Sequence, residues 1–488
     1  MGYEGPKQLR LSRNLVSACK NPGCIQVKLE KDLRRGRVLL AQPNFPFISS
    51  PLGLVPKHDG GLRRIHHLSH PKQQSVNDHI PHNYASIQYI TVDKVFDLVI
   101  QGGRDCLIVK KDIKDAFRIV PIAAQQRWLF GFEWKGEYYQ EACLPFGLAT
   151  APVLFNLFAE AFEWMLKHLL QWSDTTHYLD DFIRVISKQQ THTITQAEED
   201  YLDLTLVLGI PCNTSKDRCG TTVEVLGIEI DTSIFEARLS AEKLSKAITV
   251  TEACLNQVSL SLREAQRLCG FLNFCCKVVR IGRNFMSSLW EFIAAFDPGP
   301  PARRRINFCL REDIRWWHTT LPLINGILFF DDTNRRTVQV FTDACLHGLG
   351  GFYYSDADDN WKEQLHIIKH SQSFSTRIPA LYASEHINVL ELQAILFAFQ
   401  AWAINFHRCR VVVNTDNKTA YNGLLSQRLR GRSNSPLRQI LCIAAQHDIT
   451  VEPRWLSSED NLLADALSRH DSTTVANLCP HWQNSRSI

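Results

Sequence analysis

Residues 107–117 read LIVKKDIKDAF and residues 177–186 read HYLDDFIRVI, two β-prone stretches in which acidic residues interrupt apolar runs. Asp112 follows the apolar run of the first stretch, and Asp180 and Asp181 lie at a tight turn between the two arms of the second. Runs of this kind alternate with helical patterns between about residues 45 and 235. The alternation predicts an α+β unit in which the three carboxylates lie at the ends of strands.

Three carboxylates at neighbouring strand ends have a specific chemical consequence. If Asp112 converges on Asp180 and Asp181, the anions repel one another unless divalent cations neutralise them. Mg²⁺ prefers oxygen ligands that it shares with substrate phosphates, and two such ions about 3.5 to 4 Å apart are the arrangement used for nucleotidyl transfer. The alternative interpretation of residues 177–186 is a polar hairpin turn that binds no metal.

The other elements expected in this region follow the same periodicity rules. Strands are predicted at 107–110, 127–134, 182–186 and 223–230. The stretch 152–170 is predicted to be a helix with one stripe of core-facing side chains. The residues of that stripe are Leu154, Phe158, Ala161, Met165 and Leu169.

The pattern becomes helical after residue 238. This helical stretch includes a capping-box start from Ser261 to Glu264 and ends at the loop 297–301. A third unit begins after Asn334. Its expected elements are strands at 337–344, 348–354 and 410–417 and a long amphipathic helix at 386–404.

Four further acidic residues lie in the third unit, namely Asp343, Glu391, Asp416 and Asp465. Asp343 and Asp416 follow apolar strand runs, whereas Glu391 lies in the amphipathic helix. The side chains that would face a core from this helix are Leu390, Ala394, Phe397 and Ala398. An acid near that face requires compensation, which a metal ion supplies. Taken one at a time, each acid is equally explained as a cap or turn residue, and His386 is read as a polar residue at the helix entry.

Length and composition limit the class of protein. The chain has 488 residues, of which 45% are hydrophobic and 21% charged, so we expect two or three folded domains and exclude a disordered or fibrous protein. The net charge of +4 is too small to prove a nucleic-acid partner. The 15 cysteines form no CxxC pair, and no apolar run approaches the ~18 residues of a membrane span. We therefore expect an intracellular protein, cytoplasmic or nuclear or both, with no membrane partner.

Four motifs in order resemble those of reverse transcriptases: DIKDAF (112–117), LPFGLATAP (144–152), YLDD (178–181) and VLGIEID (225–231). Upstream, residues 50–71 resemble the fingers hairpin of that family. The resemblance implies a multidomain α+β fold, a right-hand polymerase with fingers, palm and helical thumb. It also implies that Asp112, Asp180 and Asp181 are catalytic metal ligands.

The resemblance assigns substrate roles to further residues. It places Lys57 and Arg63 on the incoming triphosphate and Lys216 where it protonates the leaving pyrophosphate, although Lys216 alone is also explained as a solvated surface lysine. Phe117 takes the position of a steric gate that excludes a ribose 2′-hydroxyl, with a plain core aromatic as the alternative. The remaining residues expected to bind substrate are Phe146, Gly147 and Tyr178.

The third unit resembles ribonuclease H, in which four carboxylates hold two Mg²⁺ ions that activate water against an RNA phosphate. By this resemblance Asp343, Glu391, Asp416 and Asp465 are catalytic and bind metal. The implied cofactor is Mg²⁺, two ions in each active site, with Mn²⁺ as a substitute. The implied partners are an RNA template, a DNA primer, RNA–DNA hybrid and deoxynucleoside triphosphates.

The narrower resemblance is to the polymerases of DIRS-type retrotransposons. It rests on SPLGLVPK (50–57), SVND (75–78), DIRWWHTTLPLINGI (313–327), HINVLELQA (386–394) and DNLLADALSR (460–469). The expected domains are an N-terminal extension (1–44), fingers and palm (45–237), helical thumb and connection (238–335), an α/β ribonuclease H-like domain (336–470) and a C-terminal tail (471–488).

The sequence leaves two questions open. Missing functions such as integration are expected either on separate chains, including a separately encoded tyrosine recombinase, or elsewhere in a longer polyprotein of which this chain is one fragment. The rival function is that of a domesticated or decayed copy that binds nucleic acid without catalysis. The presence of all seven expected carboxylates argues against decay, because neutral drift has no reason to preserve them together.

Overall fold

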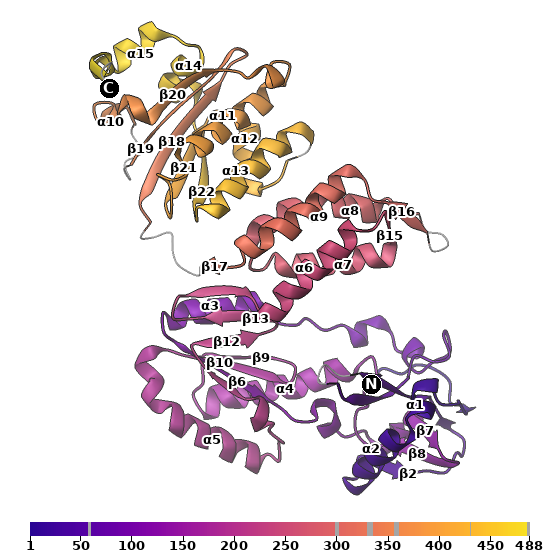
Figure 1. The fold of residues 1–488 in the computed structure, drawn as a ribbon. Helices are drawn as coiled ribbons and strands as arrows, with labels where there is room; N and C mark the ends of the chain where they lie inside the picture. The colour runs from indigo at the N-terminus through magenta and orange to yellow at the C-terminus, as the bar shows by residue number, and fades with distance from the viewer. Residues whose placement is uncertain (57–59, 298–301, 329–334, 356–360, 430, 486–488) are drawn as a thin grey trace. The chain divides into compact units, whose positions relative to one another are not determined.

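The computed structural model describes residues 1–56, 60–297, 302–328, 335–355, 361–429 and 431–485. The chain forms two compact units (Figure 1). The first unit comprises Met1–Val225 and Ile230–Ile234, and the second comprises Leu226–Glu229 and Phe235–Ile488.

The first unit is built on a four-stranded antiparallel sheet. Its strands, in spatial order, are β11 (Arg218–Gly220), β6 (Leu107–Asp112), β10 (Asp181–Ile186) and β9 (Thr175–Tyr178). Helices α4 (Ala151–Leu169) and α5 (Ile194–Val207) cover one face of the sheet, where Phe162, Phe182 and Tyr201 form part of an aromatic core. This packing holds the ends of β6 and β10 in fixed register.

A second group of strands lies in the N-terminal part of the same unit. One sheet has the order β2 (Val38–Leu40), β8 (Glu137–Glu141) and β7 (Gly131–Trp134), and β4 (Leu52–Pro56) forms an antiparallel pair with β5 (Leu62–His66). Helices α1 (Val16–Lys20) and α2 (Pro22–Arg34) contribute Ala18, Ile25 and Leu29 to the core beneath these strands. Further elements are the short parallel pair of β1 (Leu9–Arg10) and β3 (Phe47–Ile48), and helix α3 (Val92–Gly102).

Three sequence-based expectations for this unit were wrong in detail. Residues 124–130 form a 3₁₀ helix, so the strand expected at 127–134 is reduced to β7. The strand expected at 223–230 is two strands, β12 (Thr222–Val225) and β13 (Ile228–Asp231), because Leu226 and Gly227 adopt positive φ angles of 51° and 81°.

The third correction concerns the buried stripe of α4. The expected stripe is offset by one position, and its members Ala161 and Leu169 are exposed. The buried residues are Ala151, Phe155, Ala159, Phe162 and Leu166. The helix carries apolar residues on both adjacent stripes, and the 3.6-residue period alone cannot decide which of the two faces the sheet.

The second unit begins with a helical region. Its helices are α6 (Ala241–Leu255), α7 (Leu262–Cys275), α8 (Ser287–Ala294) and α9 (Phe308–Thr320). The predicted capping box at Ser261 and Glu264 is confirmed, with reciprocal side-chain to backbone hydrogen bonds. Two short antiparallel pairs accompany the helices: β15 (Ser259–Ser261) with β16 (Arg303–Arg305), and β14 (Glu236–Leu239) with β17 (Ile327–Leu328).

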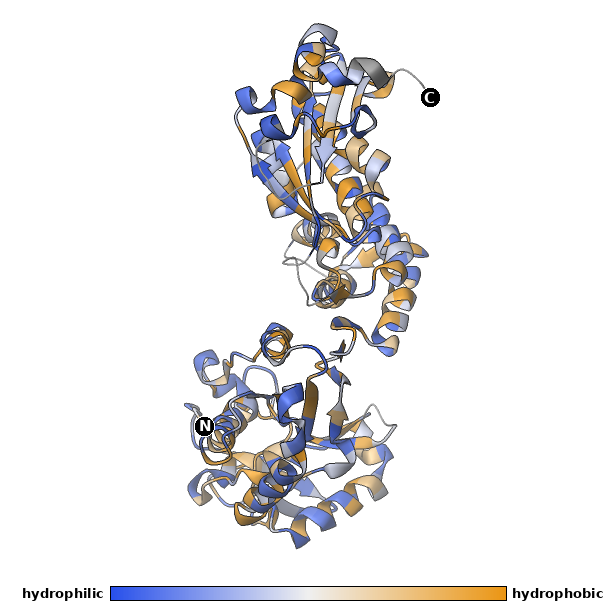
Figure 2. Cartoon of the chain, turned by 90° about the vertical axis from the view of Figure 1, so that its left-hand side faces the viewer, coloured by the Kyte–Doolittle hydropathy of each residue, from blue (hydrophilic) through white to orange (hydrophobic). Residues whose placement is uncertain are grey.

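The rest of the second unit is a mixed five-stranded sheet with helices on both faces. The strand order is β20 (Ser373–Arg377), β19 (Gly348–Tyr354), β18 (Thr337–Ala344), β21 (Arg410–Thr415) and β22 (Thr450–Trp455). One face packs against α11 (Ile387–Trp402), α12 (Lys418–Ser426) and α13 (Asn434–Gln446), and the other against α14 (Leu462–Ser468) and α15 (Ser472–Leu478). In Figure 2 the strands of this sheet carry orange, hydrophobic segments beside blue and pale ones.

Among the described helices, none combines the length with the apolar composition that crossing a bilayer requires.

Candidate active site

The first carboxylate cluster is formed by the backbone pairing of two strands. β6 ends at Asp112 and β10 begins at Asp181, and these two residues are direct partners in the antiparallel register. Leu179 adopts a positive φ of 52° in the turn before β10, and the Ile113 N–H donates to the Asp180 carbonyl over 3.0 Å. The structure thus brings Asp112, Asp180 and Asp181 together at one end of the sheet.

The cluster holds more negative than positive charge. Asp112 is only 4% exposed and accepts hydrogen bonds from Asn213 Nδ2 at 3.0 Å and Lys216 Nζ at 2.9 Å, whereas Asp181 pairs with Lys110 at 2.9 Å. Burial raises the pKa of Asp180, and the charges of Asp181 and Asp112 raise it further. Oxygen donors that crowd their charge in this way fit a divalent cation such as Mg²⁺ or Mn²⁺.

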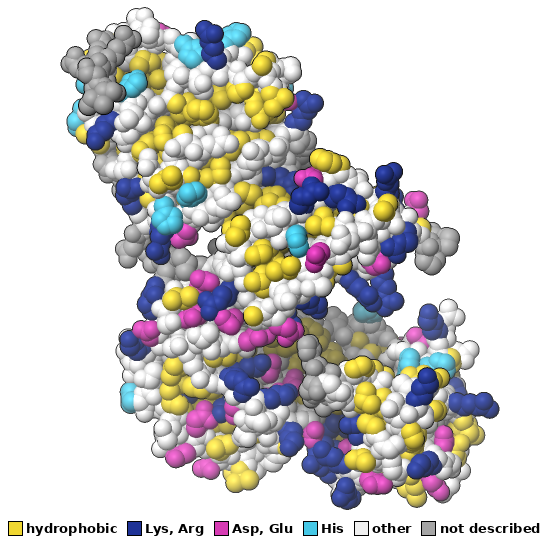
Figure 3. Space-filling view, viewed as in Figure 1, with side chains coloured by type: hydrophobic (Ala, Val, Ile, Leu, Met, Phe, Trp, Pro, Cys, Tyr) yellow, Lys and Arg dark blue, Asp and Glu magenta, His cyan; other side chains and the backbone are white. Residues whose placement is uncertain are grey.

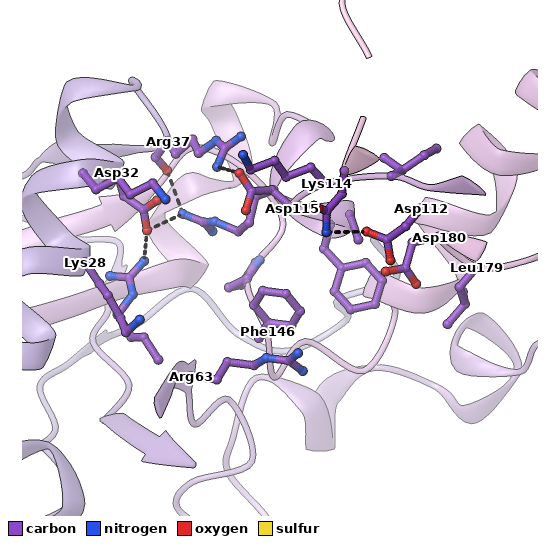
Figure 4. Close-up of a pocket in the computed structure, with 18 of the residues that line it drawn as sticks. Lys28, Asp32, Arg37, Arg63, Asp112, Lys114, Asp115, Phe146, Leu179 and Asp180 are labelled. Atoms are coloured by element: carbon purple, nitrogen blue, oxygen red, sulfur yellow. Dashed lines mark hydrogen bonds and ion pairs between the residues drawn. The ribbon is translucent and has the colours of Figure 1, made fainter. Parts of the chain in front are cut away.

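A cavity of about 790 Å³ opens beside these carboxylates. Asp112 and Asp180 lie on one side of it, and Arg63, Lys114 and Phe146 also line it (Figure 4). In Figure 3 the first unit is hollowed, and basic and acidic side chains gather around the hollow. A cavity with anionic and cationic walls suits a ligand that carries phosphates together with metal.

A second cavity, of about 560 Å³, also reaches Asp112, Asp180 and Lys216. Its other lining residues include Asp181, Lys110 and Arg218. Asp112, Asp180 and Lys216 line both cavities, so ligands bound in the two cavities would meet at the carboxylates.

Lys216 extends from a 3₁₀ turn, Thr214–Lys216, toward the cluster. Its side chain is 63% exposed, and its Nζ lies 2.9 Å from Asp112 Oδ1. The hydrogen bond to Asp112 raises the pKa of Lys216, so the ammonium retains its proton at neutral pH.

Phe117 lies in a 3₁₀ turn, Ala116–Ile119, directly after β6. The ring lines the larger cavity and also packs on other aromatic rings, with centroid distances of 5.3 Å to Phe146 and 5.7 Å to Phe155. Both proposed roles of this side chain, gate and core aromatic, are therefore compatible with its position.

Phe146 and Gly147 lie against β5. The Phe146 carbonyl accepts from the His66 N–H over 2.9 Å, and the Arg63 guanidinium lies 4.9 Å from the Phe146 ring centroid. Gly147 has φ of +124°, and a Cβ there would lie 1.9 Å from the His66 carbonyl oxygen. Only glycine fits this contact.

Tyr178 and Lys57 are the other two residues of the first unit that are predicted to bind substrate. The Tyr178 ring lies 5.0 Å from that of Tyr89, at an interplanar angle of 35°. Lys57 lies outside the described residues.

Sequence reasoning missed a buried ionic network behind the cavity. Glu141 is 1% exposed and lies 2.7 Å from Arg118 and 3.1 Å from Arg64, and Arg64 also pairs with Asp32 at 2.8 Å. Burial opposes ionisation of Glu141, but Arg118 and Arg64 outweigh it and lower its pKa. Burial lowers the pKa of the adjacent His66 to about 4, so this imidazole is neutral. The only sequence signal was that Arg118 directly follows the DIKDAF motif.

The second unit contains the other carboxylate cluster. Asp343 ends the apolar part of β18, Glu391 lies in α11 and Asp416 follows β21, and one carboxylate oxygen of each lies within 4.8 Å of the others. Asp465 of α14 raises the pKa of both Asp343 and Glu391 through its charge and pairs with Arg469 at 2.7 Å. The structure therefore places all four predicted acids in one neighbourhood.

The pKa shifts and hydrogen-bond partners of these acids fit a cation site. Burial raises the pKa of Asp343 to about 6 and that of Glu391 well above its ordinary value. Glu391 Oε2 is buried and has no hydrogen-bond partner among the described residues, whereas Asp343 Oδ2 accepts from Ser468 Oγ over 2.5 Å. A divalent cation would compensate the buried charge that these side chains bring together.

His386 acts as expected at the entry of α11. It occupies the N-cap position, where its Nδ1 accepts a hydrogen bond from the Asn388 N–H over 3.2 Å. It stabilises the start of the helix that presents Glu391.

Comparison with known proteins agrees with the geometry of the first unit. Residues 55–230 match the family model of reverse transcriptase (RNA-dependent DNA polymerase). The chain has no match among the curated proteins.

Among solved structures, the chain is similar in fold to two complexes of a foamy virus protein. One is the foamy viral protease-reverse transcriptase dRH in complex with double-stranded DNA, with a TM-score of 0.52, 18% identity, and coverage of 93% of this chain and 73% of that chain. The other is the foamy viral protease-reverse transcriptase in complex with double-stranded DNA, with a TM-score of 0.50, 18% identity, and coverage of 93% and 86%.

The matched residues contain β6, α4, β9 and β10, and with them Asp112, Asp180 and Asp181. The fold of the chain is a multidomain α+β fold similar to these viral polymerase structures. The protein thus contains a reverse transcriptase domain, over residues 55–230.

Proposed function

We propose that this chain is an RNA-directed DNA polymerase of a retrotransposon, which adds deoxynucleotides to a DNA primer on an RNA template. The observation that carries the proposal is the register pairing of Asp112 with Asp181, which gathers three carboxylates beside a cavity lined by Arg63 and Lys114. This combination fits a nucleoside triphosphate better than it fits a neutral ligand.

Asp112, Asp180 and Asp181 would hold two Mg²⁺ ions, for which Mn²⁺ can substitute. When bound, these ions lower the pKa of the primer 3′-hydroxyl and neutralise the triphosphate. The chain's own side chains carry the other tasks. Arg63, with Lys57, binds the triphosphate, because each brings a fixed positive charge to a polyanion.

Lys216 and the aromatic residues act on other parts of the nucleotide. Lys216 Nζ holds a proton beside the carboxylates and delivers it to the leaving pyrophosphate. The Phe117 ring, which lines the larger cavity, occupies the space below the sugar and excludes a 2′-hydroxyl. We also assign substrate binding to Phe146, Gly147 and Tyr178, of which Phe146 lines the same cavity.

We propose a second activity for the second unit, cleavage of the RNA strand of RNA–DNA hybrids. Asp343, Glu391, Asp416 and Asp465 would hold two Mg²⁺ ions there, and the close approach of the first three supports this assignment. We assign fingers and palm to residues 45–237, thumb and connection to 238–335 and the ribonuclease H-like domain to 336–470, between an N-terminal extension (1–44) and a C-terminal tail (471–488).

We further propose that the chain comes from a DIRS-type element, acts inside the cell and works with a separately encoded tyrosine recombinase. The motifs at 50–57, 75–78, 313–327, 386–394 and 460–469 support the subgroup. A tyrosine-recombinase reading frame next to the gene is the expected finding, and its absence beside an integrase frame contradicts the subgroup.

The polymerase proposal is tested by primer extension with the purified full chain. Wild-type protein is expected to extend oligo(dT) on poly(rA) with Mg²⁺ and dTTP, whereas Asp112→Asn is not. The alternative function, a copy that binds nucleic acid without catalysis, predicts that both proteins bind the hybrid duplex with equal affinity and that neither extends the primer.

A further inference from the structure

Lys111 is a buried charge next to the first carboxylate cluster. Side chains alternate along a strand, so Lys111 points to the opposite face of β6 from Asp112, into the layer where Phe182 packs against the helices. Its side chain is 9% exposed. A lysine at this depth is costly unless its charge is matched.

Two carboxylates from different segments match that charge. Lys111 Nζ donates to Glu198 of α5 and, over 2.9 Å, to Asp217, and it lies 5.4 Å from the Tyr201 ring centroid. Within the described part of the chain, neither Glu198 nor Asp217 has another cation at ion-pair distance. Lys111 binds Asp217 Oδ2, whereas Asp217 Oδ1 is buried and has no hydrogen-bond partner there, so Lys111 is the partner on which this carboxylate depends.

Asp217 directly follows Lys216, and the segment that carries both is bound to the end of β6. The Asn213 N–H donates to the Asp112 carbonyl over 2.9 Å, and Asn213 Nδ2 donates to Asp112 Oδ2 over 3.0 Å. Backbone pairing also holds both ends of the segment, because Cys212 forms a bridge with Ile113 and Arg218 pairs with Lys110 in the ladder of β11 and β6. Between these ends, the side chains of Asn213 and Asp217 attach the turn to the end of β6.

The Lys216 side chain, in contrast to that of Lys111, is not buried. Its side chain is 63% exposed, and an exposed lysine loses rotamer freedom when it holds one position. Its distance of 2.9 Å from Asp112 Oδ1 therefore depends on where the backbone of residues 213–217 is held.

We propose that Lys111 is a positioning residue, which fixes the turn through Asp217 so that Lys216 reaches the carboxylate cluster. This inference rests on the role proposed above for Lys216. Lys111 lies on the opposite face of β6 from the carboxylate cluster and acts through adjacent residues: Asp112 is its own neighbour in the chain, and Lys216 is the neighbour of its partner Asp217.

Two single substitutions separate this role from ordinary stabilisation. Asp217→Asn removes the charge that ties Lys111 to the turn, and Glu198→Gln removes the charge that ties it to α5. Each substitution leaves Lys111 with one charged carboxylate partner and changes the side-chain volume little. Each therefore removes one negative charge beside Lys111, so the two variants can be compared directly.

Measured by rapid-quench primer extension, Asp217→Asn should lower the incorporation rate at saturating dTTP by about tenfold or more, while Glu198→Gln stays within about twofold of wild type. Template–primer affinity should not change in either variant. Hydrogen–deuterium exchange of residues 212–217 should accelerate in Asp217→Asn and not in Glu198→Gln. Equal loss of rate in both variants, or no loss in Asp217→Asn, overturns the proposal.

The double variant Lys216→Ala/Asp217→Asn separates this inference from the proposed function. Its rate should equal that of Lys216→Ala alone, because the turn then has no lysine left to position. If Lys216→Ala extends the primer at the wild-type rate, the role of Lys216 is wrong and the inference falls with it. If instead Asp217→Asn slows the Lys216→Ala protein further, Lys216 keeps its role and the positioning inference alone is wrong.

Lys111→Met gives a second line of evidence, with Lys188→Met as its control. Lys188 pairs with Asp105 on the surface of the same unit, 67% exposed. Lys111→Met should reproduce the rate loss and the faster exchange of residues 212–217, and Lys188→Met should show neither. Wild-type rates for Lys111→Met contradict the proposal.

Discussion

Asp112 lies directly opposite Asp181 in the antiparallel pair of β6 and β10, so backbone register brings the two carboxylates together. No side-chain contact between them is needed, and their mutual repulsion is opposed by the ladder hydrogen bonds and by Phe182, buried in the aromatic core one residue after Asp181. A substitution that removes one carboxylate should therefore leave the fold intact and affect the chemistry alone.

The first prediction separates the two carboxylate clusters. Asp180→Asn should lower DNA synthesis by about 10³-fold or more, equivalent to roughly 4 kcal/mol, because a metal ligand is lost, while hybrid-RNA cleavage stays near wild type. Asp343→Asn should have the reverse effect. Both activities are measured on one labelled RNA–DNA hybrid, and normal primer extension by Asp180→Asn would falsify the assignment of the YLDD turn.

The second prediction concerns the cationic wall of the larger cavity. Arg63→Ala should raise the Michaelis constant for dNTP by about tenfold and change the maximal rate little, because the guanidinium contacts the triphosphate in ground state and transition state alike. Arg34→Ala, at another exposed arginine of the unit that does not line this cavity, is the control. Unchanged nucleotide kinetics with weaker template binding would instead assign Arg63 to the nucleic-acid surface.

The third prediction concerns acid sensitivity. Burial lowers the pKa of folded His66 to about 4 from an ordinary value of 6.5. Between these values the unfolded chain binds a proton that the folded chain does not, so the free energy of unfolding falls as the pH decreases from 6.5 to about 4, by roughly 3 kcal/mol.

His66→Gln should flatten this pH dependence, because the amide can still donate to the Gly131 carbonyl, 3.0 Å from His66 Nε2, but does not titrate. Urea unfolding at pH 6.5 and 4.5, followed by tryptophan fluorescence, measures the effect. His192→Gln, at an exposed histidine of the same unit, is the control, and an equal pH dependence in His66→Gln and wild type contradicts the prediction.

The fourth prediction concerns the contact between Gly147 and His66. Gly147→Ala should destabilise the protein by at least about 2 kcal/mol, because it adds a steric clash with the His66 carbonyl to the strain of a positive φ. Gly136→Ala also has a positive φ, +85°, but its Cβ meets open space, so it should cost about 1 kcal/mol. Equal losses of stability in Gly147→Ala and Gly136→Ala would show that backbone strain, and not the steric clash with His66, causes the destabilisation.

The sequence predicts best those features that depend on residues close together in the chain. The strands predicted at 107–110 and 182–186 are confirmed, because strand runs are short-range patterns, but the first extends to Asp112 and the second begins at Asp181. The neighbourhood of Asp343, Glu391 and Asp416 was inferred from a resemblance to a family, since acids so far apart in the chain share no periodicity.

The contacts that the sequence did not predict are long-range. The pairs of Glu141 with Arg64 and Arg118, and of Lys111 with Glu198 and Asp217, join residues from distant segments, and nothing in the local pattern marks them as partners. Lys111 belongs to the stretch 107–117, but its burial follows from the packing of α5 on the sheet, which the sequence does not show.

The last prediction tests the sugar gate, and its control comes from the aromatic core. Phe117 lines the larger cavity and also touches Phe155, which is fully buried and does not line the cavity. Phe117→Val should open the space that a ribose 2′-hydroxyl needs, so ribonucleotide use should rise and the preference for deoxynucleotides should fall by about 10²-fold, or ~2.7 kcal/mol. Phe155→Leu disturbs the same packing without opening the cavity, so it should lower the free energy of unfolding and leave the sugar preference unchanged. Single-nucleotide primer extension with dNTP and rNTP in parallel measures both. Loss of both nucleotide activities together in Phe117→Val, as in a general packing defect, would show that Phe117 is a core aromatic and not a gate.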